Sequence, residues 1–239
     1  MGTPSAVVEE LQLHASDGAT VAAFLVRSQP HRPSRTAVVL MTDILGYENH
    51  ETRAVAMLLA AHGFTTIVPD LFRGNPWVQG RDKSEYESWR RTHDPATVRG
   101  DILLARQALT ERSLGTSLGL VGFCFGGGRL MEEVALNTSG LNPDAAVAFY
   151  PTRFDPEDVG RNAHCPLLVQ TGDRDDLVPV YVVNTLRETL QANASVKEWN
   201  VEVYEGFGHA FAHHPSSEAD KAQSEVAFAR ALAWLKRHL

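Results

Sequence analysis

The stretch LVGFCFGGG at residues 120–128 is the most informative part of this sequence. It begins as a short apolar run typical of a buried strand, continues through a Gly-x-Cys-x-Gly pattern and ends in glycines that open a helix. A sharp strand-to-helix turn of this kind exposes the side chain at its apex, and Gly122 and Gly126 leave room where Cβ atoms would clash. The stretch therefore predicts a turn that presents Cys124 as a nucleophile.

The segments on either side of this turn alternate between strand and helix patterns. Apolar runs predict buried parallel strands at residues 37–41, 65–68, 118–123, 145–149, 166–170 and 201–204. Helix patterns occur at residues 50–62, 97–111, 127–138, 179–192 and 218–238. Residues 11–26 predict an antiparallel hairpin around a Ser-Asp-Gly turn, and residues 28–36 predict an exposed loop. The sequence therefore predicts an α/β fold with a mainly parallel sheet of about eight strands and helices on both faces.

Composition and charge narrow the class of protein. A chain of 239 residues favours one large domain over residues 1–239, with two small domains as the alternative. The net charge of −7 argues against nucleic-acid binding and against binding to anionic membranes. The N-terminus has no secretory-signal pattern, and no apolar run is long enough to span a membrane. Two cysteines, Cys124 and Cys165, make no disulfide framework, so we expect a cytoplasmic protein with reduced thiols.

An acid and a histidine follow later strands of the predicted sheet. Asp175 lies in the segment QTGDRDDLVP at residues 170–179, where Asp173 and Asp176 are alternatives for the same role. His209 lies in YEGFGHAF at residues 204–211. Both segments begin at the end of a strand, where α/β sheets bind their ligands. The order nucleophile, acid, histidine is the one found in α/β-hydrolase sheets.

These residue types support nucleophilic acyl transfer. His209 is expected to take the thiol proton, or to hold the thiolate as an ion pair, and later to protonate the leaving group. Asp175 is expected to fix the imidazole tautomer and to stabilise its charged form. We expect the backbone N–H groups of Phe125 and Ile44 to stabilise the oxyanion. The sequence has neither a P-loop nor a dinucleotide-binding glycine motif, so we expect no cofactor.

The sequence resembles the dienelactone hydrolase family, also called carboxymethylenebutenolidases, over roughly residues 8–238. The resemblance rests on GFCFGG at residues 122–127, G-x-x-D-x-x-V-P at residues 172–179, GHAF at residues 208–211 and VPDLF at residues 68–72. It implies one α/β-hydrolase domain without a large cap and a triad of Cys124, His209 and Asp175. It also implies hydrolysis of a small-molecule lactone or ester through a thioester on the cysteine. We expect a monomer or a small homo-oligomer.

One family position differs in a way that bears on the thiol. The family carries a glutamate that contacts the nucleophilic thiol in the resting enzyme, and the corresponding residue here is Asp43. Aspartate is shorter by one methylene, so its contact with Cys124 is expected to be less direct. A carboxylate close to a thiol disfavours the thiolate. A shorter acid therefore favours a resting thiolate–imidazolium pair, and the alternative role of Asp43 is that of a turn or cap residue.

The family's substrate-binding residues are only partly present. Tyr86 and Trp89 match the family spacing, whereas Arg81 is one position out of register. A second family arginine is replaced by His213. Arginine offers a fixed bidentate fork to a carboxylate, while histidine is often neutral at pH 7. These four residues are the candidate substrate-binding set, and the replacement predicts a shift toward less charged esters.

Several alternatives remain open at this stage. Cys124 as a redox sensor, with Cys165 as its resolving partner, is one, and a non-catalytic binder of small carboxylates is another. An activated thiol in an open site could also attack other electrophiles, including phosphate triesters. The histidines at residues 209, 213 and 214 lack a further ligand at zinc-site spacing, so we expect no metal. Asp70 and Arg73 are expected to form a structural ion pair.

Overall fold

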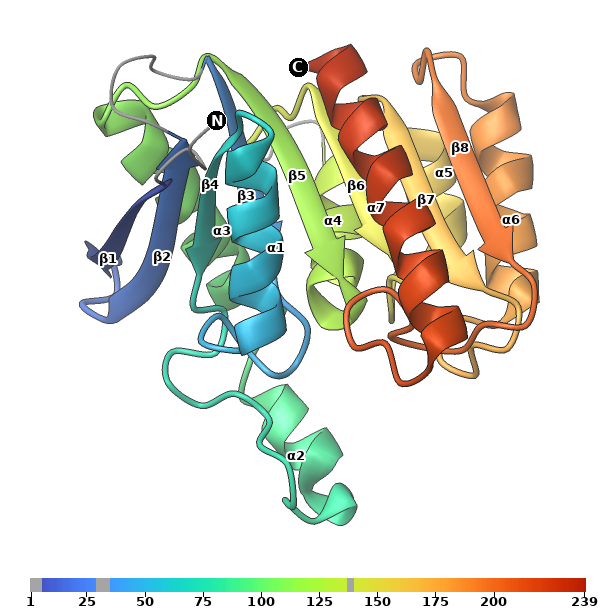
Figure 1. Ribbon diagram of the computed structural model, residues 1–239, viewed down its shortest axis with the longest axis horizontal. Coiled ribbons are helices and arrows are strands. Elements are labelled where there is room, and N and C mark those ends of the chain that lie inside the picture. Colours follow the sequence, from blue (N-terminus) through green and yellow to red (C-terminus); the bar gives the residue numbers. More distant parts are fainter. Residues whose placement is uncertain (1–5, 29–34, 137–139) are drawn as a thin grey trace. The chain divides into compact units, whose positions relative to one another are not determined.

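The computed structural model describes residues 6–28, 35–136 and 140–239. The chain divides into two compact units, residues 1–116 and 117–239, each of which has its own strands and helices (Figure 1). Most of the predicted loop at residues 28–36 lies outside the described residues.

The first unit contains a mixed set of strands in the order β1-β2-β4-β3. Strands β1 and β2 form the predicted antiparallel hairpin, β2 pairs antiparallel with β4, and β3 pairs parallel with β4. The sequence predicted β3 and β4 to within one residue at each end. The elements of this unit are β1 (Ala6–His14), β2 (Thr20–Ser28), β3 (Thr36–Met41), α1 (His50–Ala61), β4 (Thr65–Pro69), η1 (Lys83–Glu85), α2 (Tyr86–Arg91) and α3 (Pro95–Glu111).

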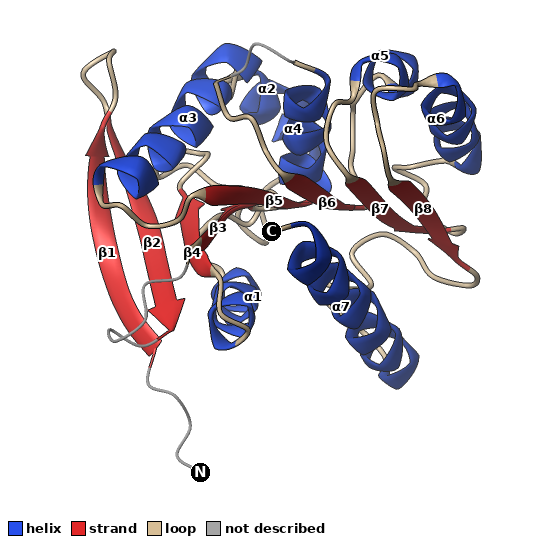
Figure 2. Cartoon of the chain, turned by 90° about the horizontal axis from the view of Figure 1, so that it is seen from above, coloured by secondary structure: helices blue, strands red, loops and turns tan. Residues whose placement is uncertain are grey.

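The two long helices of the first unit begin at polar caps and cover opposite faces of its strands. The side chain of Asn49 accepts the backbone N–H groups of Glu51 and Thr52 at the start of α1. Asp94 caps α3 in the same way, and Pro95 occupies its first turn, where its missing N–H costs nothing. Figure 2 shows α1 on one side of β2 and β4 and α3 on the other.

The second unit is a parallel α/β arrangement. Its strands follow the order β5-β6-β7-β8, and each neighbouring pair is parallel. Helices α4, α5 and α6 lie on one face and α7 lies on the other (Figure 2). The elements are β5 (Ser117–Phe123), α4 (Cys124–Ala135), β6 (Ala145–Phe149), α5 (Pro156–Asn162), β7 (Leu167–Gly172), α6 (Val180–Ala192), β8 (Trp199–Tyr204) and α7 (Glu218–His238).

The α/β class, the mainly parallel strands and the antiparallel hairpin are confirmed. The short helices α2 and α5 were not predicted, because six and seven residues carry too little periodicity to detect. The predicted helix at residues 127–138 begins three residues earlier, at Cys124, because the turn itself is the first turn of α4. Among the described residues, no helix is long and apolar enough to cross a membrane.

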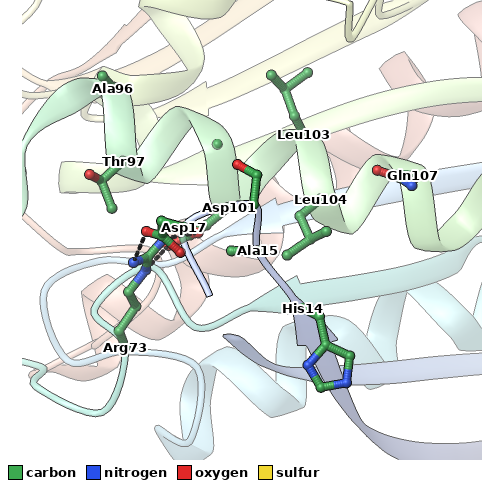
Figure 3. Close-up of a pocket in the computed structure, with 12 residues that line it drawn as sticks. His14, Ala15, Asp17, Arg73, Ala96, Thr97, Asp101, Leu103, Leu104 and Gln107 are labelled. Carbon is green, nitrogen blue, oxygen red and sulfur yellow. Dashed lines mark hydrogen bonds and ion pairs between the residues drawn. The ribbon is translucent and has the colours of Figure 1, made fainter. Parts of the chain in front are cut away.

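The predicted pair of Asp70 and Arg73 is wrong. Asp70 instead accepts the backbone N–H groups of Phe72 and Gly74. The guanidinium of Arg73 donates twice to Asp101 of α3, at 2.9 and 2.8 Å, and once to Asp17 of the hairpin turn, at 2.7 Å (Figure 3). These three side chains lie in the wall of a cavity of about 600 Å³ within the first unit. Since the side chain of Asp101 is only 1% exposed, Arg73 neutralises a buried charge.

We expect Arg73→Leu to lower the free energy of unfolding by about 3 kcal/mol, because it leaves the Asp101 carboxylate buried without its cation. Leucine keeps much of the aliphatic volume of arginine. The backbone at this position is left-handed, with a φ of 49°, which is disfavoured for both residues, so the substitution changes mainly the charge. Urea unfolding followed by circular dichroism measures the change. The matched control is Arg81→Leu, whose partner Glu85 is 52% exposed, and it should cost less than about 1 kcal/mol. Equal losses in both variants would contradict this account.

Candidate active site

Cys124 occupies the apex of a strained turn between β5 and α4. Its φ of 50° lies in the left-handed region, which a cysteine adopts at an energetic cost. The glycine before it is required, because a Cβ on Gly122 would lie 2.7 Å from the carbonyl oxygen of Gly126. A Cβ on Gly128 would overlap the carbonyl oxygen of Thr152. The local sterics therefore agree with the interpretation of residues 120–128 as a turn that presents the cysteine.

The surroundings of the thiol combine burial with a helix N-terminus. Cys124 is 9% exposed and is the first residue of α4, a helix of 12 residues. The partial positive charge at a helix N-terminus favours an anion, including a thiolate or a developing oxyanion. The backbone N–H of Phe125 belongs to the same turn. The carbonyl oxygen of Cys124 accepts the N–H of Thr152 at 3.1 Å, which ties the turn to the loop after β6.

Asp175 and His209 form a hydrogen-bonded pair in the second unit. Nδ1 of His209 lies 2.8 Å from Oδ2 of Asp175. A carboxylate only accepts, so Nδ1 carries the proton and Nε2 is left for the nucleophile. Asp175 is 3% exposed, whereas Asp173 and Asp176 are exposed. The structure therefore favours Asp175 among the three acids of this loop.

The carboxylate of Asp175 also organises its own loop. Its Oδ1 accepts the backbone N–H groups of Leu177 and Val178 at 2.9 and 3.1 Å. The loop packs closely against the histidine loop, because a Cβ on Gly172 would overlap the carbonyl oxygen of Phe207. Both oxygens of the carboxylate are thus used, one for the loop and one for His209. This arrangement fixes the acid before any substrate binds.

The electrostatic environment favours the protonated form of His209. Burial is the largest single influence and would lower its pKa, but the Asp175 carboxylate, which accepts the Nδ1 proton, and the nearby Cys124 thiol outweigh it. Together they raise the pKa of His209 to about 10. Nε2 of His209 is buried and makes no hydrogen bond within the described residues. The distance between a base and its nucleophile is often longer than a hydrogen bond before substrate binds. The site therefore favours an imidazolium beside Cys124.

Sequence reasoning missed one residue that touches the histidine. The ring of Tyr150 packs edge-on against the imidazole of His209, with 4.9 Å between ring centroids. Tyr150 is fully buried and has a φ of 37°. Nothing in the sequence around it marks it out, because it simply ends an apolar strand. What distinguishes Tyr150 is its left-handed backbone conformation, which is unusual for a residue other than glycine and is visible only in the structure.

His213 is buried rather than held out toward solvent. It is 3% exposed, and its ring stacks on Phe123 with 4.4 Å between centroids. Its backbone N–H donates to the hydroxyl of Tyr150 at 3.1 Å. The side chain therefore packs beside the strand that ends at the nucleophile, and its proposed contact with substrate remains a prediction.

Two candidate site residues, Asp43 and Ile44, follow the end of β3 in the first unit. Asp43 is 5% exposed, and its Oδ1 accepts the backbone N–H of Leu45 at 2.9 Å. This is the turn-capping role that the sequence left open. The carbonyl oxygen of Ile44 accepts the N–H of Trp77 at 2.8 Å. The proposed roles of Asp43 toward the thiol and of Ile44 toward an oxyanion remain predictions.

Arg81, Tyr86 and Trp89 belong to an aromatic cluster in the segment between β4 and α3. Trp89 is 1% exposed, and its indole N–H donates to the carbonyl of Asn75 at 2.8 Å. Tyr86 packs against both Trp77 and Trp89. Arg81 pairs with Glu85 and lies over the Trp77 ring. The cluster explains why this short segment is ordered, and Trp89 acts as its core.

Parallel strands, a strained turn with a cysteine at its apex between strand and helix, and a hydrogen-bonded acid–histidine pair on later loops are features of the α/β-hydrolase class. A model of the dienelactone hydrolase family matches residues 21–239. The chain therefore belongs to the dienelactone hydrolase family, whose members are hydrolases.

Individual relatives agree with this assignment. A carboxymethylenebutenolidase homolog of Xenopus tropicalis is 32% identical over 216 residues, which cover 89% of this chain and 86% of that protein. The mouse homolog is 31% identical over 209 residues, covering 85% and 82%. The solved structure of a dienelactone hydrolase-like promiscuous phosphotriesterase from metagenomic libraries superimposes with a TM-score of 0.76 at 19% identity. It covers 97% of this chain and 99% of the other. The last comparison bears on the fold alone.

Proposed function

We propose that this protein hydrolyses lactones or activated carboxylic esters through a triad of Cys124, His209 and Asp175. The observation that carries the proposal is the part-buried His209–Asp175 hydrogen bond of 2.8 Å beside a cysteine at the apex of a strained turn. The raised pKa of His209, to which Cys124 itself contributes, supports the same reading. These groups have the chemistry of a nucleophile, a base and an orienting acid.

In the first step Sγ of Cys124 attacks the ester carbonyl carbon. A carbon–sulfur bond forms, and the carbonyl π electrons move onto oxygen. As the tetrahedral species collapses, the bond to the leaving oxygen breaks, and His209 donates the proton that it holds at Nε2 to that oxygen. The products are an alcohol, or the ring-opened hydroxyl or enol of a lactone, and a thioester on Cys124.

In the second step water cleaves the thioester. His209, now neutral, takes a proton from the water as its oxygen attacks the carbonyl carbon. The carbon–sulfur bond then breaks, which releases the acid and restores the thiolate beside an imidazolium. Asp175 keeps Nδ1 protonated throughout, so that Nε2 is available for every proton transfer.

The developing oxyanion needs donors in both steps. We assign one to the backbone N–H of Phe125, which lies in the first turn of α4, where the helix dipole favours negative charge. The second is the N–H of Ile44, as the sequence pattern predicts. Loss of one such donor typically costs about 3 kcal/mol of barrier.

The proposed substrate class follows from the residue at one of the family's arginine positions. A family arginine is replaced by His213, which is buried and stacked on Phe123. The site thus offers no fixed bidentate fork at that position, and we propose a preference for esters that carry less negative charge. Turnover of phosphate triesters is a weaker secondary proposal. Its support is an analogy with one solved structure of similar fold, which is described as a promiscuous phosphotriesterase.

The redox alternative is disfavoured by the second cysteine. Burial is the largest cause that raises the pKa of Cys165, to about 12, and the charge of Asp144 adds to it. A thiol of this kind is almost entirely protonated at neutral pH and reacts slowly, which is a poor property for a resolving residue. A non-catalytic binder, in turn, has no use for a strained cysteine beside a positioned base.

Trapping the acyl-enzyme tests the proposal. Wild-type protein is mixed with p-nitrophenyl acetate, quenched in acid within milliseconds and digested for mass spectrometry. We expect one acetyl group on the peptide that contains Cys124, together with a burst of p-nitrophenol, because a thioester accumulates when hydrolysis is slower than acylation. Cys165→Ala is the matched control and should label in the same way. Turnover without any acetylated Cys124 would contradict the covalent mechanism.

A further inference from the structure

Tyr150 is the first residue after β6, and it adopts a conformation that its type disfavours. Its φ is 37°, and the next residue but two, Arg153, is also left-handed with a φ of 58°. The Tyr150 N–H donates to the carbonyl of Gln170 at 2.7 Å, which continues the pairing between β6 and β7. Strain at a buried non-glycine residue persists only where the surroundings hold it, and it is often found at functional sites.

One side of Tyr150 faces the histidine loop. Its ring lies edge-on to the imidazole of His209, at 4.9 Å between centroids, and against Phe211 at 5.8 Å. Its hydroxyl accepts the backbone N–H of His213 at 3.1 Å. The side chain therefore contacts the loop at three places: the imidazole of His209, the ring of Phe211 and the backbone N–H of His213. These contacts restrict both the rotation of the ring and the path of the loop.

The loop that begins at Tyr150 also contacts Cys124. Thr152, two residues after Tyr150, donates its N–H to the carbonyl of Cys124 at 3.1 Å. The loop also lies directly on the first turn of α4: a Cβ on Gly127 would come within 3.1 Å of Pro151. A single short segment, residues 150–152, thus touches the residue that attacks and the residue that takes its proton.

We propose that Tyr150 is a positioning residue, which holds the His209 imidazole by its ring while its loop holds Cys124, so that Nε2 and Sγ stay aligned. This inference rests on the proposed triad. A misplacement of about 1 Å between reacting groups can cost about 100-fold in rate, so such an element has a large effect without touching the substrate.

Loss of the ring should also change the titration of His209. Within residues 117–239, the charged groups that face its imidazole are Asp175 from the loop after β7 and Cys124 from the start of α4, and both raise its pKa against the opposing effect of burial. His213 instead faces Phe123 and His214. If the imidazole turns away from its partners while remaining buried, the raising contacts weaken, and the pKa of His209 falls.

Tyr150→Leu, Tyr150→Phe and a matched control test the inference. The control is Tyr204→Phe, which removes the same hydroxyl from another buried tyrosine. Tyr204 also packs on Phe211 but donates to Gln170, and its ring has no contact with His209. Two quantities are measured in each variant: kcat/KM for p-nitrophenyl acetate, and the titration of His209 by NMR, assigned through its absence in His209→Gln.

We expect Tyr150→Leu to lower kcat/KM about 100-fold and to lower the midpoint of the His209 titration by about one pH unit. Tyr150→Phe keeps the ring, so it should lose about tenfold in kcat/KM and shift the midpoint less. Tyr204→Phe should leave the midpoint unchanged, even if it lowers thermal stability.

An unchanged midpoint in Tyr150→Leu, with kcat/KM within about threefold of the Tyr204→Phe value, would overturn the inference. The titration does not depend on turnover. It therefore tests the role of Tyr150 even if p-nitrophenyl acetate proves not to be a substrate, and a failure of the proposed function is recognised separately by the absence of acetylated Cys124.

Discussion

Cys124→Ala is expected to lower kcat for ester hydrolysis by about 10⁵-fold, the scale at which removal of a nucleophile leaves only binding and oxyanion stabilisation. Alanine has no group that can form an acyl-enzyme, and His209 then has no nucleophile to deprotonate except water. The fold should be retained, because alanine occupies the same strained position with φ of 50° and a smaller side chain. Circular dichroism and thermal unfolding check that retention.

The measurement compares hydrolysis of p-nitrophenyl acetate and of a dienelactone by wild type, Cys124→Ala and Cys165→Ala. Cys165 is the matched control, since it is the other free cysteine and is also buried. We expect Cys165→Ala to keep wild-type rates. The ratio of the two substrates in the wild type reports the effect of His213 at the family arginine position. Near-wild-type activity in Cys124→Ala would end the triad reading.

Asp175→Asn is expected to lower kcat by about 10⁴-fold with little change in KM. Asparagine is the same size, and its carbonyl can still accept the N–H groups of Leu177 and Val178, which the loop requires. Its other group is then an amide NH₂ directed at Nδ1 of His209. Because a donor cannot accept the Nδ1 proton, the imidazole adopts the wrong tautomer, and Nε2 can no longer act as the base.

The same variant has a pH signature with a definite sign. The hydrogen bond and charge of Asp175 help to raise the pKa of His209 to about 10, whereas burial opposes the raise. Without the carboxylate, only Cys124 still opposes the effect of burial, so the pKa of His209 falls. The alkaline limb of the profile of kcat/KM against pH, where the imidazolium is lost, should therefore move to lower pH. An NMR titration of His209 measures the same change directly.

Asp176→Asn is the matched control for this substitution. Asp176 is the next residue, carries the same charge and is exposed. We expect it to leave kcat and the titration of His209 within about threefold and about 0.3 pH units of wild type, because an exposed charge is screened by solvent. If Asp176→Asn instead has the larger effect, the acid of the triad has been assigned to the wrong residue.

Short-range sterics explain in part why the turn at Cys124 could be predicted from the sequence. Gly122 is needed because a Cβ there would meet the carbonyl of Gly126, only four residues later, so this part of the pattern at residues 120–128 has a local cause. Gly127 and Gly128 instead make room for residues 149–152, which the sequence alone does not show. The parallel strands were predictable for a similar cause, because continuous burial on both faces leaves an apolar run in the sequence. The resemblance to the dienelactone hydrolase family was also found from the sequence, and the family model that matches residues 21–239 confirms it.

The remaining features depend on partners that lie far apart in the chain. The sequence placed Asp175 ahead of Asp173 and Asp176 only through the register of a family motif, whereas the packing of one loop against another buries Asp175 and directs it at His209. Arg73 pairs with Asp101, 28 residues away, rather than with its close neighbour Asp70.

The sequence by itself determined the class of fold and named Cys124 and His209 as candidate site residues, because periodic constraints and some steric ones act over a few neighbouring residues. Only the tertiary structure showed the hydrogen bond between Asp175 and His209, identified Asp101 as the partner of Arg73 and brought Tyr150 against His209. The physical reason is that burial, which controls both charge pairing and pKa, is a property of the surrounding fold and has no counterpart in the local sequence.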